Sequence, residues 1–581
     1  MVQQAIGEQA TQQQAGVYRP VIGLSSATAN QPNTSDQFCF WLAPDLIVNP
    51  FDIVEAAQVA PEGGQSRTFG IVTTLQHTTD APTHLSNFIS NDFGQVNAEA
   101  NTVRQGTTIA QVNVLSNDQD IYMPVMCDSP VRFADEPGIH KALGIDQVPE
   151  RFRVPAGLVE MSNGTRAVIY LDSRYILGPE GAHVNITGIS GLATKTSYMI
   201  FLIQSLLQKV QNRDKLGVII LNVKHGDLLS IDEPKAGGLS AEEHDLWEAV
   251  GLTPKPFDNV RYLLPYGKDT ATTGFPNSFR LPERNWFTYA YSLGDTYNKL
   301  DLLLSHIPDP WDTVGALIGE ISQGLSDTAT GQWGPTKKWA GASTWKGLLG
   351  GPPLIDPASG QAQGVGDVRA VSVGRFRRLL RRIVQTRQSG IFVENRAKQT
   401  KSIEAEIARI KGGETVVVDI AKLTDEEQTL VFGDILRTIY ALYAEEGSER
   451  EDLPEKVLIF VDELNKYAPA REKESPIIEQ VLDIAERGRS LGVVLLGAEQ
   501  FMSAVHERVV GNCSTTVIGR TGSSELSSPA YRFLDPAVKS NIARLEKGEL
   551  VISHATFRQP VKIRFPRPAY KQEGAEEPSL T

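Results

Sequence analysis

The chain has 581 residues, too many for one hydrophobic core, so two or three domains are expected. With 41% hydrophobic and 22% charged residues, the composition is that of a globular protein. The net charge of −13 argues against a surface that coats nucleic acid, although a local basic channel is compatible with it. The three cysteines, Cys39, Cys127 and Cys513, lie far apart, which excludes a disulfide framework and a cysteine metal site.

The apolar runs are too short to span a membrane, and the first residues lack the pattern of a signal peptide. A cytoplasmic protein with no membrane partner is therefore expected. Residues 1–36 are rich in Gln, Ala, Thr and Asn, which predicts a flexible N-terminal segment. Between residues 37 and 178, short apolar runs alternate with turn residues, which predicts an N-terminal β-barrel. This range has no catalytic spacing of His, Cys or carboxylates, so it is expected to dock a partner or brace an assembly.

A glycine-containing loop between a strand and a helix begins the next region. It reads His183-Val-Asn-Ile-Thr-Gly-Ile-Ser-Gly-Leu-Ala-Thr-Lys-Thr-Ser197, and an apolar, helix-like stretch follows. In such a loop, backbone N–H groups, a helix N-terminus and one ammonium all point at the same anion. The residues expected to bind nucleotide are Gly188, Gly191, Thr194, Lys195, Thr196 and Ser197.

The loop departs from the common pattern G-x-x-x-x-G-K-[ST]. It is one residue longer between Gly188 and Lys195, and Thr194 stands where the last glycine is usual. A glycine there lets the backbone approach phosphates closely or take a positive φ. Two alternatives therefore stay open: a turn that binds nothing, and a nucleotide site with slow or no hydrolysis.

A second segment supplies what such a loop lacks. It reads Lys456-Val-Leu-Ile-Phe-Val-Asp462-Glu463, an apolar strand that ends in two carboxylates. Carboxylates at this place hold magnesium and orient water for attack on a phosphate. ATP and Mg²⁺ are therefore the expected cofactors, with Thr196 and Asp462 on the metal and Glu463 as the catalytic residue. Together the two segments predict a nucleoside triphosphatase.

Three further residues are candidates for a catalytic role. Gln500 follows the next apolar run, where an amide can sense the γ-phosphate or hold the attacking water. Arg489 lies just before that run and Arg520 ends the following one. Arginines so placed can stabilise transition-state charge, including across a subunit boundary. The alternatives are a capped strand end for Gln500 and a surface ion pair for each arginine.

The strand signals define a parallel sheet with an interruption. The expected α/β core covers 179–235 and 405–568, with a mainly helical insertion at 236–404 and a mobile tail at 569–581. Within the insertion, the stretch from Arg375 to Ile383 sorts into an apolar stripe and an arginine face at helical spacing. This face is a candidate contact for phosphate backbones, and a solvated face or a protein-docking surface is the alternative.

The order of these parts resembles one family, the HerA-type hexameric DNA translocase ATPases of the HerA/FtsK superfamily. The resemblance is carried by the phosphate loop and by Asn222-Val-Lys-His-Gly-Asp227, Asp462-Glu463, Gly488-Arg489, Glu499-Gln500 and Asn512–Arg520. It implies a RecA-like P-loop ATPase core, a homohexamer, double-stranded DNA in the pore and a barrel that docks an effector. Members with divergent loops are similar to ATPases of bacterial antiviral defence pairs, whose effector is a nuclease or an NAD-consuming enzyme. Asn222 departs from the family, which usually has an acid there.

Two functions of different classes are therefore expected. The first is an ATP-hydrolysing hexameric motor on double-stranded DNA that works with a nuclease or other effector, in antiviral defence or DNA-end processing. The second is a nucleotide-binding ring scaffold that assembles or gates an effector with little translocation. The Asp462-Glu463 pair favours the motor, whereas Thr194 and the longer loop favour the scaffold. A coupling ATPase of the conjugation type is disfavoured, since no membrane helix precedes the core.

Overall fold

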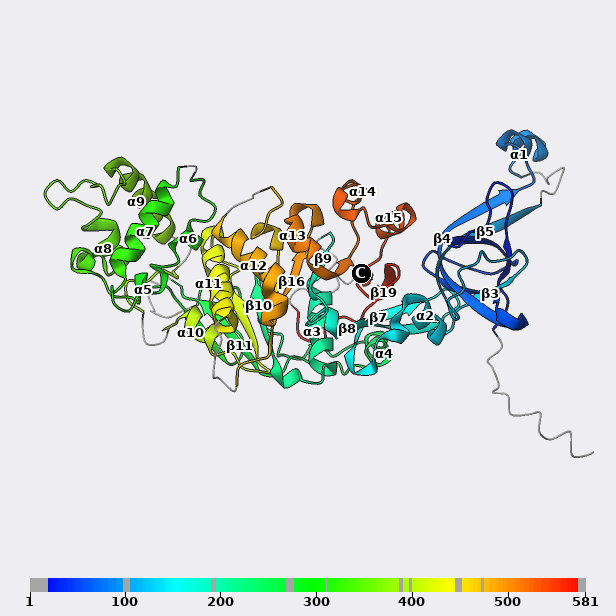
Figure 1. Cartoon of the computed structure of the whole chain (residues 1–581), viewed down its shortest axis with the longest axis horizontal. Coiled ribbons are helices and arrows are strands. Elements are labelled where there is room, and N and C mark those ends of the chain that lie inside the picture. Colours follow the sequence, from blue (N-terminus) through cyan, green and yellow to red (C-terminus); the bar gives the residue numbers. More distant parts are fainter. Residues whose placement is uncertain are drawn as a thin grey trace, which may run out of the picture. The chain divides into compact units, whose positions relative to one another are not determined.

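A computed structural model gives the fold (Figure 1). It describes residues 19–97, 105–189, 195–235, 237–267, 276–309, 311–385, 390–396, 400–444, 452–471 and 475–572. The chain divides into two compact units. One comprises 1–147, 159–167 and 556–561, and the other comprises 148–158, 168–555 and 562–581. The mixed α/β fold class with an N-terminal barrel, expected from the sequence, is confirmed.

The first unit is built on a closed barrel with strand order β1-β2-β5-β4-β3-β6. Side chains that alternate along the strands fill it, among them Phe40, Phe69 and Val112, which are fully buried. β4 and β5 continue their pairing as far as Thr79 and Gly106, and helix α1 follows β4. The elements are β1 (Gly23–Ser26), β2 (Gln37–Leu42), β3 (Ile53–Val59), β4 (Gln65–Thr79), α1 (His84–Ser90), β5 (Gly106–Asn117), β6 (Pro130–Phe133) and α2 (Glu136–Leu143).

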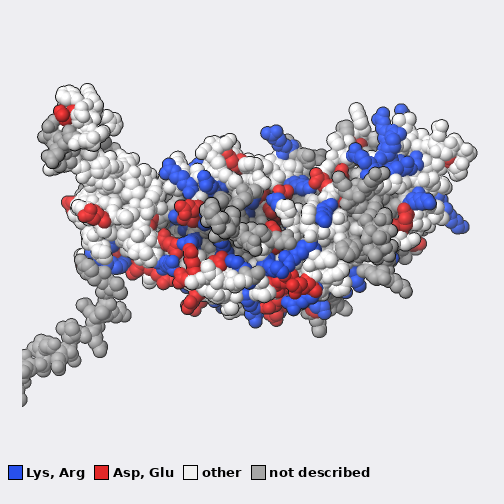
Figure 2. All heavy atoms as spheres, turned by 180° about the vertical axis from the view of Figure 1, so that it is seen from behind, with Lys and Arg blue, Asp and Glu red and all other residues white. Residues whose placement is uncertain are grey.

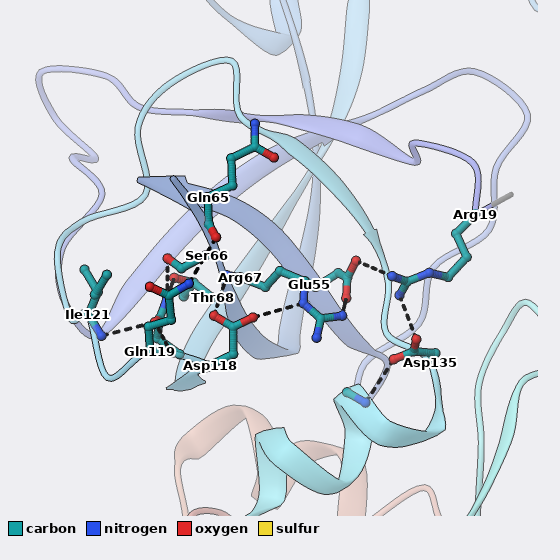
Figure 3. Close-up of polar contacts among 12 residues, drawn as sticks. Arg19, Glu55, Gln65, Ser66, Arg67, Thr68, Asp118, Gln119, Ile121 and Asp135 are labelled. Carbon is teal, nitrogen blue, oxygen red and sulfur yellow. Dashed lines mark hydrogen bonds and ion pairs between the residues drawn. The ribbon is translucent and has the colours of Figure 1, made fainter. Parts of the chain in front are cut away.

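A network of charged side chains joins the start of the described chain to the barrel (Figure 3). Arg19 pairs with Glu55 at 3.0 Å and with Asp135 at 3.5 Å. Arg67 joins the same Glu55 at 3.2 Å and Asp118 at 3.1 Å. Because the Glu55 side chain is only 6% exposed, two arginines compensate for its buried charge. Part of the range 1–36 is thus ordered, and the sequence expectation of a flexible segment is wrong from Arg19 onward.

The second unit is built on a 13-stranded sheet with order β13-β12-β11-β14-β10-β15-β16-β9-β17-β18-β19-β7-β8. The strands from β13 to β17 in this order run parallel. Most of them are short apolar runs buried on both faces, as expected for strands covered by helices, whereas β12, β13 and β17 are partly exposed. Their bounds are β9 (Ala182–Thr187), β10 (Leu216–Asn222), β11 (Val260–Pro265), β12 (Trp286–Tyr289), β13 (Thr400–Lys401), β14 (Thr415–Asp419), β15 (Lys456–Asp462), β16 (Val493–Glu499) and β17 (Cys513–Ile518).

Four strands complete the other end of this sheet. They are β7 (Arg153–Glu160), β8 (Arg166–Asp172), β18 (Glu549–His554) and β19 (Val561–Arg564). β7 and β8 fall in the range 37–178 expected for the barrel, yet they pair with the sheet. Short alternating runs do not say which sheet a strand joins, and this is why the sequence placed them wrongly.

The expected helical insertion at 236–404 also needs correction, because β11, β12 and β13 within it extend the parallel sheet. Its helices fall mostly between β12 and β13. They are α4 (Ala241–Ala249), α5 (Leu293–Thr296), α6 (Leu300–Leu303), α7 (Thr313–Leu325), α8 (Trp345–Gly350), α9 (Ala370–Val384) and α10 (Ile403–Ala408). The remaining helices are α3 (Lys195–Lys209), α11 (Asp425–Ala444), α12 (Pro476–Leu491), α13 (Glu507–Gly511), α14 (Ser523–Leu526) and α15 (Pro536–Ile542). Among the described helices, none is both long and apolar enough to cross a bilayer.

Candidate nucleotide-binding site

Three neighbouring parallel strands bring the expected site residues to one edge of the sheet. β15 pairs with β16 so that Asp462 faces Ala498, and β16 pairs with β9 so that Glu499 faces Thr187. The carboxyl ends of these strands therefore meet, which is where ligands bind in open α/β sheets. Asp462 at the end of β15, Glu463 directly after it, and Lys195 near both therefore share this edge.

Lys195 is the first residue of α3, directly after the phosphate loop. Its side chain is buried, and its ammonium has no hydrogen-bond partner within the described part of the chain. Burial lowers the pKa of Lys195, and nearby Asp462 offsets part of this effect. A buried cation without a partner is costly unless an anion compensates it. The arrangement therefore fits a bound phosphate beside the N-terminus of α3.

Gly188 shows why the end of β9 needs a glycine. Its φ is 151°, and a Cβ there would lie 3.1 Å from the Cα of Gly519. Just beyond it, Ile189 N–H donates to the Arg520 carbonyl at 2.9 Å, which ties the loop to the end of β17. The other expected loop residues, Gly191 and Thr194, lie outside the described residues.

The two carboxylates after β15 differ in their settings. Asp462 is buried, and its Oδ1 accepts a hydrogen bond from Glu463 N–H at 2.9 Å. Glu463 has φ 59° and ψ 46°, a left-handed conformation that costs energy for a residue with a side chain. Lys224 lies beside both, with Nζ 2.7 Å from Glu463 Oε1 and 3.6 Å from Asp462 Oδ2.

A third carboxylate, Glu499, ends β16 and is completely buried. Asn185 Nδ2 donates to its Oε1 at 2.8 Å, while Glu499 Oε2 has no partner among the described residues. Burial raises the pKa of Glu499 to about 8, although the bond from Asn185 and the charge of Lys195 act in the opposite direction. The next residue, Gln500, accepts at its carbonyl from Thr187 Oγ1 at 3.3 Å, which places it at the site edge.

The two candidate arginines occupy different places. Arg520 follows β17 and is exposed, and its backbone contacts the start of the phosphate loop. Arg489 lies in the last turn of α12, shortly before β16 begins, and donates to the Glu180 carbonyl at 3.3 Å. Strand starts lie at the sheet edge opposite the carboxyl ends, so Arg489 is not brought to the site of its own subunit.

The structure assigns Asn222, at the end of β10, a structural contact. Its amide donates to Asp419 Oδ1 and to the His225 carbonyl, both at 2.8 Å. Sequence reasoning missed the contact of Lys224 with both site carboxylates. The signal was available, since Lys224 follows the carboxyl end of a parallel strand as Asp462 and Gln500 do.

The residues at this edge also fit a magnesium ion that arrives with a nucleotide. The described residues hold no cluster of three or more His, Cys, Asp or Glu that forms a metal site. Mg²⁺ usually needs only one or two protein oxygens when phosphates supply others. The half-buried Thr196 and the Asp462 carboxylate meet that requirement. Ser197, the next residue of α3, is buried.

Comparison with known proteins leaves the family open. No protein-family profile matches the sequence, and no curated protein matches it. The conjugative coupling protein TrwBdeltaN70, from a bacterium, is 13% identical over 75% of this chain and 92% of its own, with TM-score 0.40. The genome packaging NTPase B204 of Sulfolobus turreted icosahedral virus 2 is 14% identical over 29% of this chain and 72% of its own, with TM-score 0.21.

The cytoplasmic domain of the Type VII secretion ATPase EccC from Thermomonospora curvata is also similar in part. It is 15% identical over 72% of this chain and 29% of its own, with TM-score 0.27. TM-scores this low give no evidence of function. The evidence for function lies in the residues of the site.

Proposed function

We propose that this chain is an ATP-hydrolysing P-loop motor of the HerA/FtsK type that works as a homohexamer on double-stranded DNA. The observation that carries the proposal is the buried, unpartnered ammonium of Lys195 at the start of α3, at the sheet edge that also carries Asp462 and Glu463. A cation, a helix N-terminus and an acidic pair at one edge are the parts that phosphoryl transfer requires.

In this mechanism Lys195 and the N-terminus of α3 hold the β- and γ-phosphates. Thr196 and Asp462 would hold Mg²⁺, which neutralises charge on the phosphates when bound. Glu463 accepts a proton from water as the water oxygen bonds to the γ-phosphorus. The bond from phosphorus to the bridging oxygen breaks, and its electron pair stays on ADP. Gln500 holds the attacking water, and an arginine of a neighbouring subunit stabilises the transition state.

The DNA part of the proposal is supported by α9. Arg375, Arg378 and Arg382 are exposed on this helix, opposite the buried Phe376 and Leu380. In Figure 2, blue side chains gather at the upper right, over the region of α9. An exposed arginine face on an acidic chain is suited to phosphate backbones, whose contacts carry no sequence information.

The effector part is supported by the segment that follows β4. Leu85, Phe88, Phe93 and Val96 are 63%, 49%, 69% and 93% exposed. A concentration of exposed apolar side chains usually marks a protein–protein contact. We therefore assign this segment, with the barrel that carries it, to docking of an effector, either a nuclease or an NAD-consuming enzyme of an antiviral pair.

One observation favours the second function, a nucleotide-binding ring scaffold. The ammonium of Lys224 contacts Glu463, so an oxygen of the proposed base is already paired. A ring that binds ATP and seldom hydrolyses it would assemble or gate an effector without much translocation.

Purified protein separates the two functions. Fluorescent ATP binding and phosphate release are measured with and without duplex DNA. The motor predicts turnover that duplex DNA stimulates, while tight binding with no phosphate release under either condition supports the scaffold. Failure to bind ATP contradicts both.

A further inference from the structure

Lys224 makes an ion pair with the carboxylates at the site edge. It follows the end of β10, the strand next to β15, so its side chain reaches the carboxylates of the neighbouring strand. Its Nζ lies 2.7 Å from Glu463 Oε1. The Lys224 and Glu463 side chains are 39% and 37% exposed, so solvent reaches the pair.

The loop that presents Lys224 is anchored rather than free. Asn222 spans it by donating to the His225 carbonyl at 2.8 Å and also binds Asp419 Oδ1. The second oxygen of Asp419 accepts from Ser278 Oγ at 2.5 Å. These bonds connect the loop after β10 with the end of β14 and with the segment before β12. The backbone on either side of Lys224 is therefore anchored to the sheet edge, while its ammonium contacts Glu463 and Asp462.

The ion pair with Lys224 occupies the Glu463 oxygen that would otherwise accept a hydrogen bond from the attacking water. We propose that Lys224 is a positioning residue that holds Glu463 away from the attacking water, so that hydrolysis requires this ion pair to open. The inference rests on the proposed ATPase function and adds to it a control of the catalytic base.

The size of the effect follows from the exposure of the pair. Half-exposed ion pairs are weak, so the need to open this one slows turnover by about two- to fivefold. Lys224→Met removes the charge and keeps the length of the side chain. It should raise kcat by that factor, with KM and the affinity for a fluorescent ATP analogue unchanged, because Lys195 still holds the phosphates.

Lys466 provides a matched control. It lies three residues after Glu463 and contacts Asp425 and Gln428 Oε1, the latter at 2.7 Å, and not the Glu463 carboxylate. Lys466→Met should therefore leave kcat unchanged. Lys224→Arg restores a cation beside Glu463 and should return kcat to the wild-type value, a rescue that a merely structural role would not give.

The outcomes separate this inference from the proposed function. An unchanged or lower kcat in Lys224→Met, with unchanged nucleotide affinity, overturns the positioning role. Equal turnover in the wild type and in Glu463→Gln instead removes Glu463 as the base. If the wild type binds ATP and releases no phosphate, phosphate release that appears only in Lys224→Met supports the inference. The absence of phosphate release from both proteins contradicts it.

Discussion

At the residue scale, the site combines groups whose burial is unfavourable without a ligand. The buried ammonium of Lys195 and the buried carboxyl of Glu499 lie at the same sheet edge and lack partners for some of their polar atoms among the described residues. Such groups reduce stability in exchange for function. Their replacement by residues of similar shape separates the two properties.

Lys195→Met should weaken ATP binding and stabilise the nucleotide-free protein. Loss of a charged hydrogen bond to phosphate lowers affinity by about tenfold or more. Removal of an unpartnered buried cation raises the free energy of unfolding by about 1–3 kcal/mol. Urea unfolding without nucleotide and titration with a fluorescent ATP analogue measure both effects. A variant that is less stable and binds ATP normally would show that Lys195 has a structural partner instead.

Glu499→Gln should change how stability depends on pH. The pKa of Glu499 rises from 4.5 to about 8 on folding, so the folded state holds a proton that the unfolded state has lost within that window. Stability contributed by this group is present below pH 4.5 and is lost as the pH rises to about 8, at roughly 1.4 kcal/mol per unit. Glutamine removes this slope. Parallel stability curves for the variant and the wild type between pH 5 and 8 would contradict the burial argument.

At the element scale, α9 separates into two sets of arginines. Arg377 Nε and Arg381 Nη2 donate to the Leu349 carbonyl at 3.0 and 3.2 Å, so they fasten α9 to the end of α8. Arg375, Arg378 and Arg382 are exposed, and Arg381 is exposed as well although it makes this bond. Hydrophobic periodicity predicted the helix and its apolar stripe, but a hydrogen bond to a distant carbonyl leaves no local pattern.

Reversal of Arg375, Arg378 and Arg382 to Glu should weaken duplex binding equally for all sequences. The slope of log K against log salt should fall by about 0.9 for each phosphate that the variant no longer neutralises. Basal ATP turnover should stay unchanged, since Lys195, Asp462 and Glu463 are left intact. The matched control, Arg377→Gln, should lower the unfolding temperature and leave the slope nearly intact. An unchanged slope in the triple variant would assign this face to a protein partner.

Phe88→Ser with Phe93→Ser should abolish co-purification of the effector and keep nucleotide binding. The two rings pack edge to face with centroids 6.4 Å apart, yet both remain substantially exposed. Removal of the apolar area that each ring would bury against a partner costs about 1 kcal/mol or more of binding free energy. Full effector recovery with the double variant would place docking elsewhere on the chain.

At the scale of the whole molecule, sequence periodicity predicted the presence of parallel strands better than it predicted the region to which each strand belongs. β9 and β15 lie where the sequence placed them, and β15 is an apolar run, as expected for a strand that is covered on both faces. β7, β8, β11 and β12 were assigned to the wrong region because pairing partners are a long-range property. Lys195, Asp462 and Glu463 could be predicted from motifs, whereas the contact from Lys224 could not, because it depends on which strands are neighbours.

The remaining expectation at this scale is assembly into a homohexamer. Arg520 is exposed, and Arg489 lies at the sheet edge opposite the site of its own subunit, so either arginine is available to a neighbouring subunit. In a homohexamer an arginine from one subunit completes the site of the next. Mixing Arg520→Ala subunits with Glu463→Gln subunits should therefore restore part of the turnover that each lacks alone. A monomer with full activity by light scattering, or no recovery on mixing, would contradict a finger that acts across the interface.

The central claim is that Glu463 and Lys195 serve one ATP-hydrolysing site. The most direct measurement compares ATP binding and single-turnover phosphate release in the wild type and in Glu463→Gln. Removal of a base that acts only in the transition state should leave ATP affinity unchanged and slow release by about 100-fold or more. Equal release rates in the two proteins would contradict the claim.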